Sequence, residues 1–360
     1  MNKILRGAVT PLVSILIAVF IGSIVMLATG HSPAQAYAAL FAGAFGSPVN
    51  AANTLASAIP LILSGLGVAV GFKAGLFNIG AEGQYWIGSM VAVWIGYSVP
   101  GLPPVLHVTL AIVLAMLAAG LWGGVIPGLA KALVGAHEVI TTMMMSYIAI
   151  FLSHYMLENG PMMEPGFTPQ SPVILDSAVI PKLMERTQLS WGLVIALAAV
   201  FFVWWLLFKT TLGFRLRAVG ANQRGAKYAG INVPLHLVLA LFISGTLAGL
   251  AGAVQMLGVQ QRLYDSFSSG YGFTAIVVAL LANNNPFGVI LAALFFAALA
   301  NGGQSMQLAS GVPAHLTDVI SGIIIFLIAA KGIAERIQQR WQKRRNLTLD
   351  KGAEKCSGTF

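Results

Sequence analysis

The chain has 360 residues, of which 57% are hydrophobic and only 9% are charged. A soluble domain usually carries about 25% charged residues, so the composition argues against a soluble cytosolic enzyme. The formal net charge of +9 could suggest nucleic-acid binding, but membrane topology explains the placement of the basic residues better. The single cysteine, Cys356, allows no internal disulfide and no cysteine-based metal site.

Long stretches without Asp, Glu, Lys or Arg indicate helices that cross a membrane. One stretch lies between Arg6 and Lys73, and another lies between Asp265 and Asp318. A membrane-spanning helix needs about 20 apolar residues. We therefore predict an all-α, polytopic membrane protein with about ten transmembrane or half-membrane helices. The predicted segments are 8–28, 53–72, 84–99, 104–130, 139–157, 190–208, 235–258, 272–283, 286–303 and 314–331.

The first segment has an alternative interpretation. Lys3 and Arg6, the apolar stretch, and Ala34-Gln35-Ala36 together resemble a signal peptide and its cleavage site. The apolar stretch of about 20 residues is longer than the usual 7–15 of a signal. We therefore favour a retained helix.

The basic residues indicate the orientation in the membrane. Only Lys182, Arg186 and Arg262 fall in loops on one side, whereas the other 17 of the 20 fall on the opposite side. Because cytoplasmic loops are enriched in Lys and Arg, both termini are predicted to be cytoplasmic. This requires an even number of crossings.

Three polar stretches interrupt or follow the predicted spans. Residues 158–189 are predicted to form an extracytoplasmic loop, and residues 209–234 a cytoplasmic loop. A transmembrane domain is expected over 1–335, followed by a basic cytoplasmic tail over 336–360. The start of that tail is predicted to lie against anionic membrane lipid, and a solvated tail is the alternative.

Small residues recur at four-residue spacing within the spans, which predicts close helix packing in lipid. The alternative is that some of them mark helix surfaces that slide during a transport cycle. The residues are Gly67, Gly71, Gly75, Gly120, Gly124, Gly128, Gly245 and Gly249.

The usual enzyme signatures are missing from the sequence. Gly220–Gly225 resembles a phosphate-binding loop, but Ala226 follows where lysine is required. His137-Glu138 lacks the second histidine of a zinc-protease helix, and no pair of histidines has ligand spacing. We therefore expect no catalytic residue, no cofactor and no bound metal in this chain.

Two polar groups at segment ends are candidates for a pathway or gate. Asn78, Glu82 and Gln84 lie in a glycine-rich turn and can hydrogen-bond across it, although the turn could also be a purely structural elbow. Glu82 is expected near the cytoplasmic end of a span, where its side chain can reach water. The second group, Asn283, Asn284 and Asn285, precedes Pro286 and breaks the helix. Residues 272–303 are therefore predicted to form a broken or re-entrant hairpin.

The cytoplasmic loop is predicted to contain a short helix from Asn222 to Ala229. Asn222 is a suitable N-cap, and Gly230 can close the helix in the left-handed conformation. Ala226 and Ala229 are three residues apart and so share a face. Such a helix would suit docking into a groove on a partner, whereas the alternative is an ordinary basic loop.

At this point the sequence resembles a known family. Arg217-Ala218-Val219-Gly220, with Ala226, Tyr228-Ala229-Gly230-Ile231 downstream, is similar to the coupling loop of permease subunits of ATP-binding-cassette (ABC) importers for ribose, other simple sugars and branched-chain amino acids. The stretches 72–84 and 137–142 resemble the nucleoside-import branch, which is paired with a basic-membrane-protein lipoprotein. The hairpin 275–288 also fits, except that the family usually has Gly-Gly where this chain has Asn283-Asn284.

The resemblance implies a transport subunit of the bacterial cytoplasmic (inner) membrane that moves a nucleoside or simple sugar inward by alternating access. The implied partners are separate ABC ATPase subunits, a second permease subunit and an extracytoplasmic substrate-binding lipoprotein, and nucleic acid is not among them. An ion-coupled secondary carrier or channel for a small polar solute is the alternative. Residues implied in coupling to the ATPase are Arg215, Arg217, Ala218, Val219, Gly220, Asn222, Ala226, Tyr228, Ala229 and Gly230.

Overall fold

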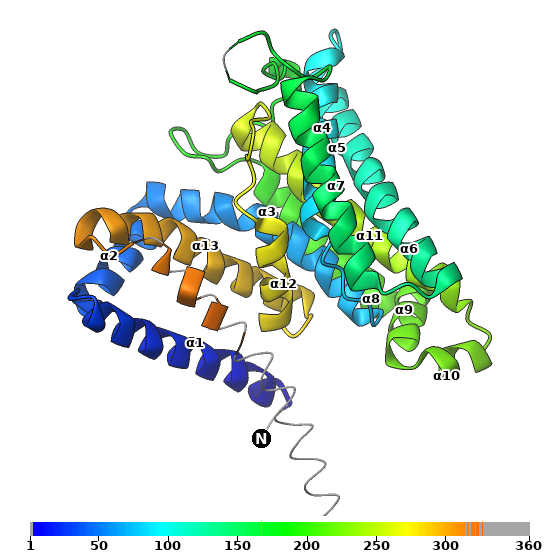
Figure 1. Ribbon diagram of the computed structural model, residues 1–360, viewed down its shortest axis with the longest axis horizontal. Helices are drawn as coiled ribbons and strands as arrows, with labels where there is room; N and C mark the ends of the chain where they lie inside the picture. Colours follow the sequence, from blue (N-terminus) through cyan, green and yellow to red (C-terminus); the bar gives the residue numbers. More distant parts are fainter. Residues whose placement is uncertain are drawn as a thin grey trace, which may run out of the picture. The chain divides into compact units, whose positions relative to one another are not determined.

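The structure is a computed structural model that describes residues 3–326, except residues 167, 314, 317, 321, 324 and 325. For residues 3–12 and 14 it describes the backbone alone. The described residues fall into two compact units (Figure 1). One unit is continuous, from Ala34 to Ala314, and the other combines the two ends of the chain. The predicted basic tail, 336–360, and most of the last predicted segment lie outside the described residues.

In the unit formed by the chain ends, one helix, α1 (Lys3–Ala28), covers the first predicted segment. Its second half, from Ile15 to Ala28, is apolar. The backbone N–H groups of Thr29, Gly30 and His31 bond to carbonyls of the last helical turns and so end the helix. The helix is compatible with either interpretation of this segment.

The continuous unit is mainly helical, and outside the helices its described residues form loops, turns and two isolated β-bridges. Three π-helical turns, η1 (Leu121–Val125), η2 (Ala130–Val134) and η4 (Met256–Gln260), extend the helices next to them. The α-helices are α2 (Pro33–Phe45), α3 (Pro48–Lys73), α4 (Ala81–Ser98), α5 (Pro104–Gly120), α6 (Ile126–Leu129), α7 (Glu138–Glu158), α8 (Gly192–Lys209), α9 (Thr211–Ala221), α10 (Gln223–Tyr228), α11 (Val233–Gln255), α12 (Tyr271–Leu281) and α13 (Pro286–Ser310).

Caps and prolines determine where several of these helices begin. The side chains of Ser47, Asn232 and Asn285 each accept a hydrogen bond from a backbone N–H in the first turn, at 3.1 Å in all three cases. A proline follows each cap within the first two helical positions, where its fixed φ suits a helix start and its missing N–H is not needed. These signals explain the starts of α3, α11 and α13.

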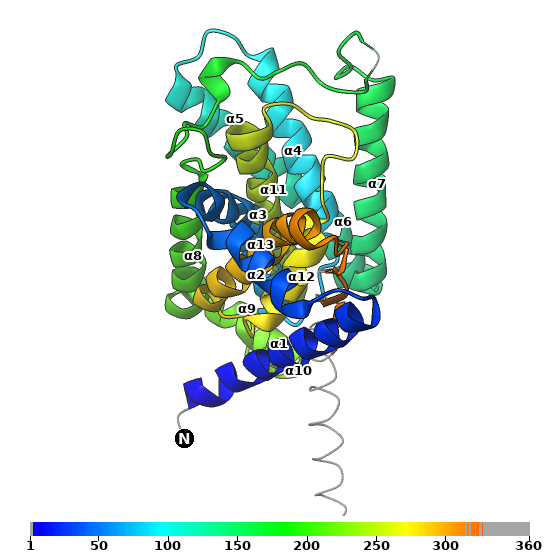
Figure 2. The ribbon, with the colours of Figure 1, turned by 90° about the vertical axis from the view of Figure 1, so that its left-hand side faces the viewer.

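The continuous unit is organised around α11, which packs against α3, α4 and α5. Figure 2 shows α7 and α8 on opposite sides of this group. The most apolar stretches of α3 and α11 are 83% and 72% buried, against 22% for α7 and 33% for α8. Since the outer helices expose apolar side chains such as Phe151 and Phe201, they are suited to a lipid environment, where the surface of the protein need not be polar.

Glycines permit the close packing of the central helices. A Cβ at Gly88 would lie 2.4 Å from the Cα of Gly249, and a Cβ at Gly67 would lie 2.6 Å from the carbonyl oxygen of Ser244. A Cβ at Gly124 would lie 2.2 Å from the Cα of Phe242. The predicted close packing at the spaced glycines is therefore confirmed.

Six helices of the described residues are long and apolar enough to cross a membrane, and α13 is one of them. The predicted hairpin appears as the short α12 followed by the long α13. At 11 residues, α12 spans about 16 Å, roughly half of a bilayer core. The helices α2 and α9 were not predicted. Both are short, at 13 and 11 residues, and α9 is also much less apolar than the spanning helices, so a search for long hydrophobic stretches misses them.

Candidate translocation and coupling site

The cytoplasmic loop has the local structure that its capping residues predict. Asn222 lies between α9 and α10, and its side-chain oxygen accepts a hydrogen bond from the backbone N–H of Gly225 at 3.0 Å. Gly230 has a φ of +78° and follows the end of α10. The predicted short helix with these two boundaries is therefore confirmed.

The exposed surface of α10 differs from the face that the sequence predicts. Tyr228 is 94% exposed, and Asn222, Ala229 and Gly230 are also exposed. Ala226 is only 4% exposed and packs in a cluster with Leu216, Val219, Leu237 and their neighbours. The prediction that Ala226 shares an outward docking face with Ala229 is wrong, because Ala226 anchors α10 to the protein's own core.

The glycine-rich turn and the cytoplasmic loop, far apart in the sequence, meet in the structure. A Cβ at Gly220, near the end of α9, would lie 2.2 Å from the carbonyl oxygen of Lys73 and 2.8 Å from the backbone nitrogen of Gly75. Gly75 itself has a φ of +75°. Backbone therefore contacts backbone here, and a side chain at Gly220 has no room.

The remaining residues predicted to take part in coupling lie on α9. Arg215 is exposed, whereas Arg217 is half-buried, with its guanidinium 5.1 Å from the ring centroid of Phe208 on α8. Val219 is 1% exposed and belongs to the same cluster as Ala226, and Ala218 is half-buried. Helix α9 is therefore built into the core on one side and carries charge on the other.

Two of the predicted pathway residues form a buried hydrogen-bond network with a third residue from α11. The side-chain nitrogen of Asn78 donates to Gln84 Oε1 at 2.9 Å and to Ser244 Oγ at 2.8 Å. Asn78 and Gln84 are 1% exposed, and Ser244 is fully buried. The predicted hydrogen bonding across the turn is confirmed for Asn78 and Gln84. Their partner on α11, 166 residues along the chain, has no local sequence signal.

Glu82 has a different set of partners. One carboxylate oxygen accepts from Trp86 Nε1 at 2.9 Å and from Ser268 Oγ at 2.5 Å, and the other accepts from the backbone N–H of Gly272 at 2.7 Å. Glu82 is only 2% exposed, so the expectation that it reaches water is wrong. Its carboxylate instead lies at the N-terminus of α12, where free N–H groups and the helix dipole favour a negative charge.

The three asparagines before Pro286 form a tight turn between α12 and α13. Asn283 and Asn284 have φ values of +50° and +56°, in the left-handed region that asparagine and glycine tolerate best. This explains how asparagines can stand where the resembled family has Gly-Gly. Asn285 caps α13. The 11 residues of α12 separate these asparagines from Glu82, which is bonded at the other end of that helix, and their geometry points to a structural turn.

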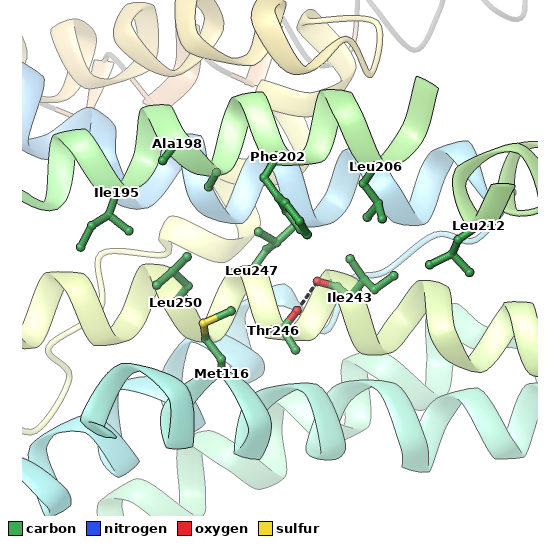
Figure 3. A pocket seen from close by; sticks show the side chains of 11 residues that line it. Met116, Ile195, Ala198, Phe202, Leu206, Leu212, Ile243, Thr246, Leu247 and Leu250 are labelled. Atoms are coloured by element: carbon green, nitrogen blue, oxygen red, sulfur yellow. Dashed lines mark hydrogen bonds between the residues drawn. The ribbon is translucent and has the colours of Figure 1, made fainter. Parts of the chain in front are cut away.

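A cavity of about 490 Å³ lies elsewhere, between α5, α8 and α11 (Figure 3). Its walls are apolar, with Met116, Phe202 and Leu247 among them. The hydroxyl of Thr246, also in the wall, donates to the carbonyl oxygen of Ile243 at 2.8 Å. This lining is suited to hydrocarbon and not to a polar solute. The buried polar residues near α12 are therefore better candidates for a pathway.

Comparison with known proteins gives a consistent result. Residues 50–329 match the family described as "Branched-chain amino acid transport system / permease component". The guanosine ABC transporter permease NupP of Bacillus subtilis is 38% identical over 96% of this chain and 99% of its own. The nucleoside ABC transporter permease NupB of Lactococcus lactis is 38% identical over 93% of this chain and 94% of its own.

A third relative has a different substrate in its name. The glucose ABC transporter permease TsgB13 of Haloferax volcanii is 36% identical over 89% of this chain and 87% of its own. All three relatives are ABC transporter permeases, and the family match covers most of the membrane helices. The chain therefore belongs to the branched-chain amino acid transport system permease family and is a membrane-spanning permease subunit of an ABC transporter.

Proposed function

We propose that this chain is a permease subunit of a nucleoside importer in the bacterial cytoplasmic membrane. The observation that carries the proposal is the 38% identity to the guanosine permease NupP across 96% of the chain. A simple sugar is the second candidate substrate, because the glucose permease TsgB13 is 36% identical. The nucleoside is favoured because two nucleoside permeases match over a larger part of the chain.

In this proposal the energy comes from separate ATPase subunits that dock on α10. The exposed Tyr228 ring offers a rigid aromatic side chain of the kind that often dominates binding energy at protein interfaces. Movement of α10 would pass to α9 through the cluster around Ala226, and from Gly220 to the turn at Gly75. That turn continues to Asn78, which is bonded to α4 and α11. A contiguous, tightly packed route of this kind could couple docking to the helices that line a pathway.

The remaining partners follow from the same proposal. A second permease subunit would complete the pathway, and an extracytoplasmic binding lipoprotein would deliver the substrate to the loop at 158–189. The chain itself would hydrolyse no ATP, since the sequence carries no phosphate-binding loop. No cofactor or metal is needed for this role.

The test is uptake by the complete transporter reconstituted in proteoliposomes. We expect uptake of guanosine or adenosine that requires ATP and exceeds uptake of glucose. Uptake of glucose without uptake of either nucleoside would favour the sugar alternative. Uptake that follows an ion gradient without ATP would overturn the proposal in favour of a secondary carrier. The purified chain alone is expected to show no ATPase activity.

A further inference from the structure

Four aromatic rings lie together beside the N-terminus of α12, and we call them the aromatic cluster. They belong to Tyr85 and Trp86 of α4, Phe267 of the preceding loop and Tyr271 of α12. The ring centroids of Trp86 and Phe267 are 4.3 Å apart, and those of Tyr85 and Phe267 are 5.9 Å apart with the rings stacked. Tyr85 and Tyr271 are also 5.9 Å apart. The Glu82 carboxylate borders the cluster through its bond to Trp86.

One buried hydroxyl of the aromatic cluster is without a hydrogen-bond partner. Tyr85 is 0% exposed, and its hydroxyl has no partner among the described residues. Leaving a buried hydroxyl unsatisfied is costly, and a phenylalanine at position 85 would avoid that cost. The Tyr85 hydroxyl is therefore free to bond a polar ligand that reaches the cluster.

The loop that covers the cluster is bonded to the predicted extracytoplasmic segment. This covering loop, 261–270, accepts backbone hydrogen bonds from Ser171 and Ile174 at 2.9 Å each. Asp265 in the loop donates to Pro169 at 3.2 Å. The inner end of the loop carries Phe267 and Ser268, which contact Trp86 and Glu82. A movement of the outer segment would therefore move the residues that cover the cluster.

We propose that the aromatic cluster is a substrate-binding station for nucleosides within the membrane, opened when the covering loop moves. The planar base would stack on the rings of Phe267 and Tyr85, and a sugar hydroxyl would bond to the hydroxyl of Tyr85. The assignment rests on the proposed function and adds to it the residues that recognise the two halves of the substrate. Base stacking on aromatic rings is tolerant of base identity, which suits a transporter for several nucleosides.

The first test removes one hydroxyl from the reconstituted transporter with the Tyr85→Phe variant. Because the hydroxyl has no partner in the closed protein, the variant should be as thermally stable as the wild type, or more so. The KM for nucleoside uptake should rise about fivefold, the effect of losing one hydrogen bond. The matched control is Tyr97→Phe on the same helix, which should transport as the wild type does. A merely structural tyrosine would leave this KM unchanged.

The second test shortens the stacking surface with Phe267→Leu. Purine uptake should fall more than pyrimidine uptake, because a purine stacks over a larger area. A general packing defect would lower purine and pyrimidine uptake equally, and that result would overturn the assignment. The assignment would also be overturned if the wild type imports nucleosides and both variants transport them as well as the wild type does. A wild type that imports no nucleoside would instead overturn the proposed function and this assignment together.

Discussion

At the scale of single residues, Gly220 is a position in the coupling region where a side chain has no room. The nearest atoms to a Cβ there belong to the backbone of residues 73–75, which cannot rotate away as a side chain could. We predict that Gly220→Val destabilises the protein by about 1–3 kcal/mol, the usual range for overpacking. Thermal unfolding in detergent and membrane abundance measure the effect.

The matched control is Gly225→Ala, at a nearby helical glycine. A Cβ there would lie 3.5 Å from the Asn222 side chain, an ordinary van der Waals contact. Alanine also favours a helix over glycine by up to about 1 kcal/mol. This variant should be at least as stable as the wild type. Equal stability of Gly220→Val and Gly225→Ala would contradict the close backbone contact.

Glu82 gives a second prediction at this scale. In Glu82→Gln, one of the two accepting oxygens becomes an N–H donor that faces the N–H groups of Gly272 or Trp86. The loss of a charge at the N-terminus of α12 adds to the lost hydrogen bonds. We predict a loss of stability of about 1–3 kcal/mol, measured by thermal unfolding. An unchanged melting temperature would show that the carboxylate does not hold α12 in place.

At the scale of elements, α10 is predicted to be the contact for the ATPase. Because Tyr228 is almost fully exposed, Tyr228→Ala should change folding stability by less than about 0.5 kcal/mol. If the ring docks into a partner groove, the variant should lose uptake and ATPase co-purification, as interface anchors cost about 2 kcal/mol or more when truncated. Gln223→Ala, also exposed on α10, is the control. Full uptake by Tyr228→Ala would remove Tyr228 from the docking contact.

The short helices also show what sequence can predict and what it cannot. The boundaries of α10 were predictable because Asn222 and Gly230 act within a few residues of their own positions. The burial of Ala226 was not, because it depends on Leu216 and Leu237, which are distant partners. In the same way, the sequence shows that the turn with Asn78 and Glu82 is polar. The bond of Asn78 to Ser244 and that of Glu82 to Ser268 depend on tertiary packing, which the sequence does not show.

At the scale of the whole molecule, the spans and their orientation rest on general physical rules about membranes. Most predicted spans have a counterpart helix in the structure, because a bilayer requires long apolar stretches. The two predicted loops, 158–189 and 209–234, also fall between long helices, the first between α7 and α8 and the second between α8 and α11. The side on which each loop lies depends only on the distribution of Lys and Arg, so it is still a prediction.

Introduced cysteines test that orientation in intact cells, in a Cys356→Ser background. The 17-to-3 distribution of basic residues predicts that Glu185 lies outside and Lys227 inside. Both positions are exposed in the structure, so burial would not limit their reactivity. Glu185→Cys should therefore react with a membrane-impermeant maleimide added to cells, and Lys227→Cys should react only after the membrane is opened. The reverse pattern would turn the molecule over, place α10 outside the cell, and exclude α10 as the contact for a cytoplasmic ATPase.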